Sequence, residues 1–332
     1  MANDLDVVSG GAGFIGSHLV DRLMAEGRRV LAIDNLAVGR LANLTQHEGN
    51  ARFRFVQADV RDRAAMRELL DGADRVFHLA ALADIVPSVQ NSEAYFDANV
   101  NGSYAVAEAA RAVGVRRLVY AASSSCYGIP DAYPTPETAE IRPQYPYALT
   151  KNLGEQVFLH WAKVYDLPVV SLRFFNVYGP RARTSGTYGA VFGVFLAQKL
   201  AGKPLTVVGD GTQTRDFTYV ADVVDAILAA VERGRTGEIY NVGSGTTVSV
   251  NRLVELIGSD QVDHLPKRPG EPDCTFADIG KISRDMGWQP RIPVEEGVAR
   301  LLHDLGYWQD APVWTPDTIA EATKDWFKYL GR

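Results

Sequence analysis

The sequence predicts an α/β protein with a doubly wound parallel sheet and a smaller C-terminal lobe. The first observation behind this prediction is that short apolar runs alternate with segments of helical length through the first half of the chain. The second is a glycine-rich turn that joins the first apolar run to the first helical segment. Strands are therefore expected at residues 5–8, 30–33, 53–56, 75–79, 118–121 and 169–172.

A long helix is expected between the fourth and fifth strands, over residues 92–113. Tyr95, Asn99 and Val106 fall on one face of it, and Gly114 follows as a typical C-terminal glycine. The alternating pattern breaks after residue 179 into longer loops rich in glycine and proline. One further strand-like run, at 238–242, is expected to rejoin the sheet.

The composition excludes several classes of function. The chain has 332 residues, 46% of them hydrophobic, which is ample for a large core. A net charge of −6 gives no cationic surface for nucleic acid or an anionic membrane. Two cysteines and six scattered histidines form no metal-ligand pattern, so no metal is expected. Without a signal-peptide pattern or an apolar run of about 20 residues, we expect a cytoplasmic protein.

The turn after the first strand has the composition of a dinucleotide-binding loop. Gly10, Gly13 and Gly16 allow a tight turn, approach of the backbone to a pyrophosphate, and close packing of the helix on the sheet. Such a loop can also be purely structural, and Asp34 at the end of the second strand can be a turn residue. Together, however, they predict NAD rather than NADP, because a carboxylate binds the ribose 2′-hydroxyl and repels a 2′-phosphate.

These features define two expected domains. Residues 1–176, with the strand near 238–242, form a Rossmann-type NAD-binding domain. Residues 177–332 form a lobe that covers the carboxyl edge of the sheet, where ligands of this architecture bind.

A second motif supplies candidate catalytic residues. Tyr147 and Lys151 are four positions apart on a predicted helix, so they share a face. Lowering the pKa of a tyrosine from about 10 to about 7 requires roughly 4 kcal/mol. An ammonium about 4 Å away, at an effective dielectric constant near 20, supplies about that much. Ser123 to Ser125 follow the fifth strand and bring hydroxyls to the same edge.

Further motifs along nearly the whole chain resemble the extended short-chain dehydrogenase/reductases, specifically the nucleotide-sugar epimerases and dehydratases. They are GGAGFIG at 10–16, DNL at 34–36, DV at 59–60, HLAA at 78–81, NVNG at 99–102, SSSCYG at 123–128, YALTK at 147–151, RFFNVYGPR at 173–181, GDGTQTRDFTYV at 209–220 and RPGEP at 268–272.

The resemblance implies roles for individual residues. Tyr147 is the catalytic base, Lys151 binds the nicotinamide ribose, and Ser123 hydrogen-bonds the reacting sugar oxygen. The cofactor site then comprises Tyr147 and Lys151 together with Gly10, Gly13, Phe14, Ile15, Gly16, Asp34, Asn35, Asp59, Val60, Leu79, Ala80, Ala81, Asn99, Ala121 and Phe174. The substrate site comprises Asp84, Ser88, Ser124, Ser125, Asn176, Val191, Thr206, Arg215, Arg268, Glu271 and Thr275. Within it, Arg215 and Arg268 bind the diphosphate and Glu271 its ribose.

The residues after Ser123 favour one reaction. The resembling 4,6-dehydratases carry an Asp-Glu pair just after the catalytic Thr, whereas this chain has Ser124 and Ser125. Serine is neither an acid nor a base at neutral pH, so a 4-epimerase acting through a 4-keto sugar is favoured. A 4,6- or 5,6-dehydratase and a non-catalytic NAD-sensing regulator remain the alternatives.

The sugar is less well defined. Val86-Pro87-Ser88 resembles the branch that acts on N-acetylated or uronic acid sugars. A small residue, Thr275, stands where the family places a gatekeeper, and it resembles enzymes that admit an N-acetyl group. Asp84 would oppose a carboxylate substrate if it points inward, or it is a loop cap. UDP-GlcNAc/UDP-GalNAc is therefore favoured over UDP-Glc/UDP-Gal.

The resemblance also implies a homodimer formed through the helices around residues 92–113 and 147–164, and a role in polysaccharide biosynthesis. No function is assigned to the aromatic-rich stretch 314–330, which lies outside the shared motifs.

Overall fold

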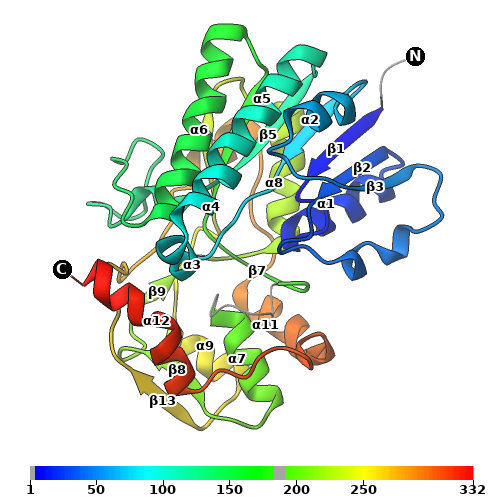
Figure 1. The fold of residues 1–332 in the computed structure, drawn as a ribbon. Helices are drawn as coiled ribbons and strands as arrows, with labels where there is room; N and C mark the ends of the chain where they lie inside the picture. The colour runs from blue at the N-terminus through cyan, green and yellow to red at the C-terminus, as the bar shows by residue number, and fades with distance from the viewer. Residues whose placement is uncertain (1–3, 183–190, 332) are drawn as a thin grey trace.

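The computed structural model describes residues 4–182 and 191–331. A parallel sheet of seven strands forms its centre, in the order β11-β6-β5-β4-β1-β2-β3 (Figure 1). The predicted doubly wound architecture is confirmed. The strands are β1 (Leu5–Ser9), β2 (Arg29–Asp34), β3 (Phe53–Gln57), β4 (Arg75–His78), β5 (Arg117–Ser123), β6 (Val169–Phe174) and β11 (Ile239–Val242).

Helices cover both faces of the sheet, and each face has its own buried apolar cluster. This explains why the strands consist of apolar runs rather than alternating residues. One face is covered by α1 (Phe14–Ala25), α8 (Val220–Arg233) and α10 (Gly280–Met286). The other face is covered by α2 (Arg63–Leu69), α5 (Gly102–Val113) and α6 (Pro146–Tyr165).

The second half of the chain returns to the sheet more extensively than the sequence indicated. The strand expected at 238–242 is β11, which pairs with β6. Helices α8 and α10 also pack their apolar residues into the sheet cluster, as does Trp288. The two expected domains are therefore interleaved rather than divided at residue 176.

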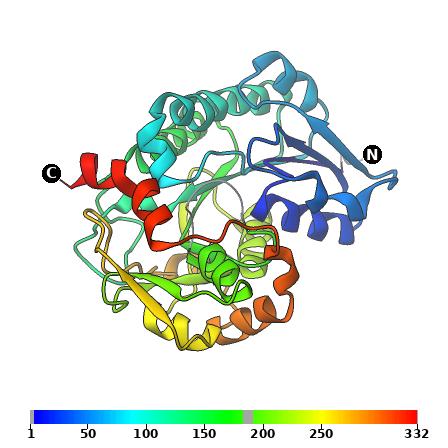
Figure 2. The same ribbon diagram turned by 60° about the horizontal axis from the view of Figure 1, so that its bottom comes forward.

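The smaller lobe has its own core, in which aromatic side chains of α7, β7 and β10 pack together. Figure 2 shows this lobe facing the carboxyl edge of the sheet. Its elements are β7 (Asn176–Tyr178), α7 (Val191–Leu200), β8 (Leu205–Val208), β9 (Thr214–Arg215), β10 (Phe217–Tyr219), β12 (Val248–Ser249), α9 (Val250–Ile257), β13 (Val262–Leu265), α11 (Val294–His303) and α12 (Pro316–Leu330).

The helix expected over 92–113 is interrupted. It consists of α4 (Ser92–Phe96), a π-helical turn over Asp97–Asn101, and α5, which ends at the left-handed Gly114 as predicted. Helix α3 (Ile85–Gln90) precedes it. Short 3₁₀ turns lie at Leu41–Asn43, Thr45–His47, Ser124–Tyr127 and Leu305–Trp308. None of the described helices has both the length and the apolar composition needed to span a bilayer.

Helix α6 buries a different face from the one its sequence suggested. The sequence places Leu149, Leu153, Val157, Trp161 and Val164 on one apolar face of this helix. Leu149 and Val164 are instead about half exposed, and the buried residues are Ala148, Thr150, Lys151, Gly154, Glu155, Phe158 and Ala162. Polar groups that bond within the site and the sheet occupy the inner face, which hid it from a reading based on hydrophobicity.

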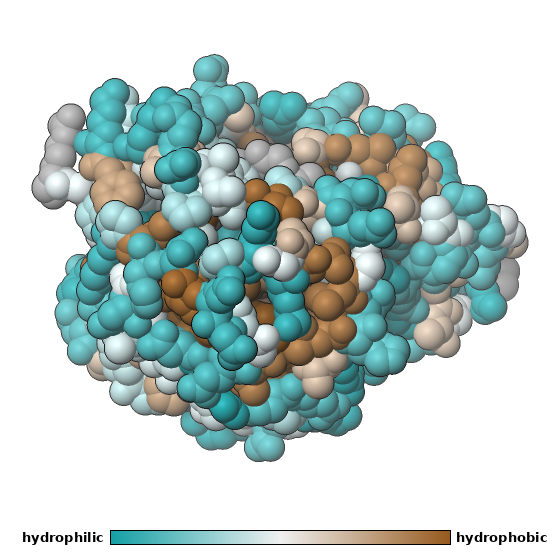
Figure 3. All heavy atoms as spheres, turned by 90° about the horizontal axis from the view of Figure 1, so that it is seen from below, coloured by the Kyte–Doolittle hydropathy of each residue, from teal (hydrophilic) through white to brown (hydrophobic). Residues whose placement is uncertain are grey.

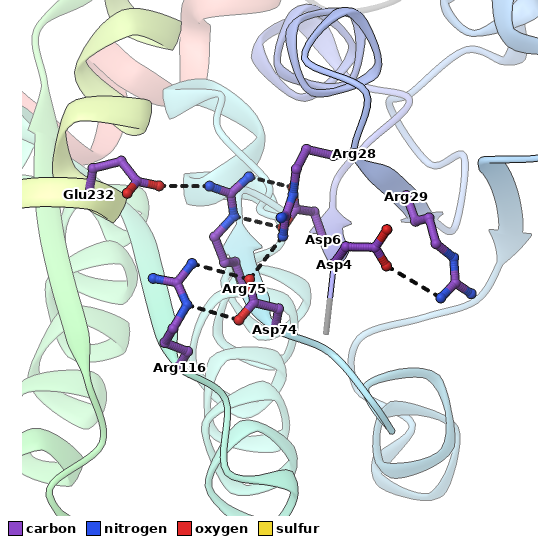
Figure 4. A network of polar contacts seen from close by, with 8 residues as sticks. All are labelled: Asp4, Asp6, Arg28, Arg29, Asp74, Arg75, Arg116 and Glu232. Atoms are coloured by element: carbon purple, nitrogen blue, oxygen red, sulfur yellow. Dashed lines mark hydrogen bonds and ion pairs between the residues drawn. The ribbon is translucent and has the colours of Figure 1, made fainter. Parts of the chain in front are cut away.

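An ion network closes the amino edge of the sheet, opposite the carboxyl edge (Figure 4). Asp6 of β1 is fully buried and accepts hydrogen bonds from Arg75 of β4 at 2.5 and 2.7 Å and from Arg28 at 2.9 Å. Arg75 also pairs with Glu232 of α8 at 2.9 Å. The network therefore ties the two central strands to a helix of the second half of the chain.

We predict that Asp6→Asn destabilises the protein by about 3 kcal/mol, because it removes the buried carboxylate that the guanidinium of the buried Arg75 contacts at 2.5 and 2.7 Å. Urea unfolding measures the loss. Asp4→Asn is the matched control, since Asp4 and Arg29 form an exposed pair at 3.5 Å, and it should cost about 0.5 kcal/mol or less. Equal losses in the two variants would show that the buried network has no special contribution.

Candidate active site

A cavity of about 690 Å³ lies between the sheet's carboxyl edge and the smaller lobe. It is centred where the order of strands reverses between β1 and β4, which is the ligand position in doubly wound sheets. Most of the residues predicted from the sequence line it. They are Gly10, Gly13, Phe14, Ile15, Gly16, Asp34, Asn35, Asp59, Val60, Leu79, Ala80, Ala81, Asp84, Ala121, Ser123, Ser124, Ser125, Tyr147, Phe174, Asn176, Val191, Thr206, Arg215, Arg268, Glu271 and Thr275.

The glycine turn forms one end of the cavity. Gly10 has a φ of 74°, and a Cβ there would lie 2.7 Å from the backbone nitrogen of Ala80. A Cβ at Gly16 would collide with the carbonyl oxygen of Gly10. Helix α1 begins at Phe14, and its N-cap, Gly13, has no side chain to satisfy the first N–H groups. These groups are the partners that a pyrophosphate needs, so the loop fits a dinucleotide.

Asp34 stands at the end of β2, beside this loop. Its carboxylate accepts hydrogen bonds from the backbone N–H of Ala12 at 3.1 Å and of Leu36 at 2.8 Å. Burial raises the pKa of Asp34, and these hydrogen bonds oppose the rise. Next to it, Asn35 donates to Asp59 at 2.9 Å, and Arg61 lowers the pKa of Asp59 to about 2. Asp34 therefore places a carboxylate beside the glycine loop, which disfavours an additional phosphate there.

Tyr147 and the serine turn meet in the middle of the cavity. Burial raises the pKa of Tyr147, and hydrogen bonds to Ser123 and Ser125 lower it again in part. The hydroxyls of Ser123 and Ser125 lie 2.8 Å apart. The turn Ser124–Tyr127 directly follows β5, so the end of the strand positions the hydroxyl groups of Ser123, Ser124 and Ser125.

Lys151 does not act on Tyr147 in the way the spacing suggested. Its Nζ donates to the carbonyl oxygen of Ala121 at 2.6 Å and lies 4.4 Å from the centre of the Tyr120 ring. Burial lowers the pKa of Lys151 to about 7. Lys151 does not line the cavity, and burial rather than this ammonium is the main influence on the pKa of Tyr147 in this structure.

Two other predicted contacts lie behind the wall. Asn99 is buried, and its amide exchanges hydrogen bonds with the backbone of Leu82 at 2.9 and 3.0 Å and donates to Thr150 at 3.0 Å. Ser88 is also buried and donates to the carbonyl oxygen of Ile85 at 2.6 Å. Both residues support segments that line the cavity, so neither is in the contact position expected for cofactor or sugar.

Asp84 is a lining residue with an electrostatic effect on Tyr147. It occupies the N-cap position of α3, but its side chain makes no capping hydrogen bond. Its negative charge contributes to the raised pKa of Tyr147. The inward orientation, rather than the loop-cap alternative, agrees with these observations.

A group of charged residues lies on the smaller-lobe side. Arg215 donates to Glu271 at 2.8 Å, and Arg268 lies 3.8 Å from the other carboxylate oxygen of Glu271. That second oxygen, Oε2, is buried and accepts no hydrogen bond from the described residues. Arg215 therefore pairs with Glu271, whereas its neighbour Asp216 accepts backbone N–H groups of Ser244 and Ala277.

The remaining predicted substrate residues are held by polar neighbours. Thr275 donates to Asn176 at 2.7 Å. Thr206 is bound through both its N–H and its hydroxyl to the buried Gln198, at 3.1 and 2.9 Å. Gln198 belongs to none of the sequence motifs, and only its contact with Thr206 in the folded chain shows that it supports the site.

Sequence analysis missed several aromatic residues of the wall. Tyr145, Trp314 and Trp326 all line the cavity. Tyr145 precedes Tyr147 by two positions, and the two tryptophans belong to the stretch that had no assigned role. For the two tryptophans, the only signal in the sequence was the high density of aromatic residues near the C-terminus.

Comparison with known proteins identifies the family. The sequence pattern of the NAD dependent epimerase/dehydratase family matches residues 7–243. The chain belongs to this family. It is 39% identical over 305 residues to a UDP-glucose 4-epimerase of Mycolicibacterium smegmatis, covering 89% of this chain and 96% of that protein.

Solved structures agree with this assignment. One is the UDP-N-acetylglucosamine 4-epimerase of Methanobrevibacter ruminantium, at 32% identity and a TM-score of 0.86, covering 93% and 98% of the two chains. Another is DesIV, a dTDP-glucose 4,6-dehydratase of Streptomyces venezuelae with NAD bound, at 29% identity and a TM-score of 0.85, covering 92% and 99%. This family member is thus an NAD-dependent enzyme, and the predicted cofactor is confirmed.

We predict that Tyr147 of the NAD-free enzyme stays protonated at neutral pH and ionises only above its ordinary pKa of about 10, because burial disfavours the phenolate. The ultraviolet absorbance of tyrosinate, titrated in the wild type and in Tyr147→Phe, isolates this group. Ser123→Ala should shift its ionisation to still higher pH, since the Ser123 hydrogen bond lowers the pKa. Ionisation of Tyr147 near pH 7 would contradict the prediction.

Proposed function

We propose that this enzyme is an epimerase of a nucleotide-diphosphate sugar, most specifically a UDP-hexose 4-epimerase. The observation that carries the proposal is the pairing of Tyr147 and Ser123 at a site where the next two side chains are Ser124 and Ser125. Proton exchange with a sugar hydroxyl needs one acid–base group, whereas eliminating water needs a second one. Serine hydroxyls do not supply that second group.

The residues divide the work of a 4-epimerase as follows. Tyr147, in its ionised form, accepts the proton of the C4 hydroxyl and returns it, while Ser123 hydrogen-bonds the same oxygen. The positive charge of bound NAD⁺ would favour that ionisation. NAD, held by the glycine loop and Asp34, supplies hydride transfer at C4 when bound. Epimerisation then requires the 4-keto sugar to turn over in the cavity, so that its opposite face would meet the bound cofactor, while Tyr147 returns the proton to the same oxygen. The cavity of about 690 Å³ extends from the glycine loop to the smaller lobe, and this turning would take place within it.

Arg215, Arg268 and Glu271 are suited to the nucleoside diphosphate. Two guanidinium groups can bind its phosphate oxygens through charge-assisted hydrogen bonds. The buried Oε2 of Glu271, which accepts no hydrogen bond from the described residues, can accept one from a ribose hydroxyl. Ligand binding would then satisfy a buried polar atom.

For the sugar, we propose a neutral hexose, with UDP-GlcNAc/UDP-GalNAc ahead of UDP-Glc/UDP-Gal. The negative charge of Asp84 near Tyr147 disfavours a carboxylate on the substrate. Thr275 is small and is held against Asn176, which supports space for an N-acetyl group. We also propose a cytoplasmic location, in keeping with the two free cysteines.

The experiment that tests this function is incubation of the purified enzyme, without added cofactor, with UDP-Glc, UDP-GlcNAc, UDP-GlcA and their C4 epimers. Product analysis by NMR and mass should show an isomer of unchanged mass, formed from either epimer, with the N-acetylated pair turned over fastest. Tyr147→Phe should abolish this turnover and retain bound NAD.

Other outcomes separate the alternatives. A product lighter by one water would identify a dehydratase, a possibility that the similarity to DesIV keeps open. Bound NAD without turnover of any nucleotide sugar would favour a sensor. If Thr275→Tyr left the ratio of N-acetylated to plain turnover unchanged, the gatekeeper role of Thr275 would be wrong.

We further propose that the enzyme is a homodimer. Support comes from the apolar stripe on α6, of which Leu149 and Val164 are about half exposed, and from the proximity of α6 to α5. Single exposed apolar residues are ordinary, but a stripe along one helix is typical of an interface.

We predict that Val164→Arg converts a dimer into monomers, because a charge on this apolar stripe would be buried in the contact without a partner. Sedimentation velocity measures the change. Leu200→Arg is the control, since Leu200 on α7 is also exposed and apolar but lies away from the stripe. A monomeric wild type, or dissociation in both variants, would refute this interface.

A further inference from the structure

Helix α12 connects the two lobes at the mouth of the cavity, although it lies beyond the residues that match the family pattern. It packs against α3 of the sheet lobe, where Gln90 donates to Asp325 at 2.9 Å. On the other side, the indole N–H of Trp326 donates to the carbonyl oxygen of Pro269 at 2.8 Å. Figure 2 shows the helix passing between the lobes, and Figure 3 shows the face seen from below, where hydrophobic residues gather in the middle.

Trp326 is the residue of α12 that contacts the site. It is 4% exposed and lines the cavity. The guanidinium carbon of Arg268 lies 5.4 Å from the centre of its ring, within the range of a cation–π contact. Stacking on an aromatic face restrains the plane of a guanidinium and leaves its N–H groups available for an anion.

The same ring reaches toward the catalytic tyrosine. The ring centres of Trp326 and Tyr145 are 6.3 Å apart. The ring centres of Tyr145 and Tyr147 are 6.4 Å apart, and these two rings are stacked with an interplanar angle of 6°. Burial raises the pKa of Tyr145, so this ring is neutral at neutral pH and acts by packing. One indole thus touches the arginine of the diphosphate site and the aromatic neighbour of the acid–base group.

We propose that Trp326 is a positioning residue for the diphosphate, acting through Arg268, and that α12 thereby belongs to the nucleotide-sugar site. The proposal rests on the proposed function, because Arg268 is taken to bind the diphosphate. What it adds is that Trp326, which lies outside the residues that match the family pattern, sets the affinity of the site for a diphosphate. Trp326 also contacts Tyr145, which stacks on Tyr147. We therefore expect an effect of Trp326 on turnover as well, but a smaller one than its effect on diphosphate affinity.

The test measures binding of UDP and of uridine by calorimetry to the NAD-loaded enzyme. Trp326→Leu should weaken UDP binding by about tenfold and uridine binding by less than about twofold, because only UDP carries the group that Arg268 binds. Trp326→Phe, which keeps an aromatic ring, should lose about threefold. With the nucleotide sugar that is turned over, Trp326→Leu should raise KM more than it lowers kcat.

A double-mutant cycle separates positioning from general damage. If Trp326 acts through Arg268, Trp326→Leu should add little to the loss of UDP affinity caused by Arg268→Ala. Tyr329→Leu is the matched control on the same helix, since Tyr329 is about half exposed, and it should leave UDP binding unchanged. NAD content and near-ultraviolet circular dichroism verify that each variant is folded.

Wild-type UDP affinity in both Trp326 variants, equal losses for UDP and uridine, or full additivity with Arg268→Ala would each overturn the proposal. If Trp326→Leu does not fold, the test depends on Trp326→Phe, and unchanged UDP affinity in that variant would overturn the proposal. Failure of the wild-type enzyme to bind UDP or turn over any UDP-sugar is a different outcome. It would refute the proposed function, and the role of Trp326 with it.

Discussion

The backbone segments that follow β1 and β4 approach so closely that only glycine fits between them. A side chain at Gly10 would meet the backbone of Ala80, and one at Gly16 would meet Gly10 itself. This contact brings the start of α1 against the segment that carries Ala80, Ala81 and Asp84, which forms the cavity wall. The cofactor loop, the wall and the position of Tyr147 opposite them all depend on that approach, because a displaced α1 would open the site.

Charge is distributed differently at the two edges of the sheet. At the amino edge, Asp6 is matched by two arginines, so burial of the carboxylate is compensated by strong hydrogen bonds. At the carboxyl edge, burial raises the pKa of Tyr147, so this group stays neutral at neutral pH, and lowers that of Lys151 to about 7, so this group is only partly charged there. A lysine held away from its ordinary ionisation state is typical of catalytic sites and costs stability, whereas the opposite edge contributes stability.

The smaller lobe completes the site through side chains that restrain one another. Glu271 joins Arg215 and Arg268, Gln198 holds Thr206, and Trp326 contacts both Arg268 and Tyr145. Asn99 and Ser88 play a similar supporting part on the sheet side, behind the wall rather than in it. A second layer of this kind fixes the orientation of the groups that meet a ligand, and it explains why several residues of recognisable motifs do not themselves face the cavity.

The sequence by itself determined the strands of the sheet, the glycine loop, Asp34, and the placement of Ser123 and Tyr147 at one edge. Each of these follows from local rules: the chain alternates in a regular way, parallel strands end at a common edge, and a strand end fixes the residue after it. Only the tertiary structure decided that α8 and α10 return to the sheet, that Lys151 turns to Ala121, and that Trp326 reaches Arg268. Those contacts join residues that are distant in the chain, or depend on how a buried side chain is packed, and neither leaves a periodic pattern in the sequence.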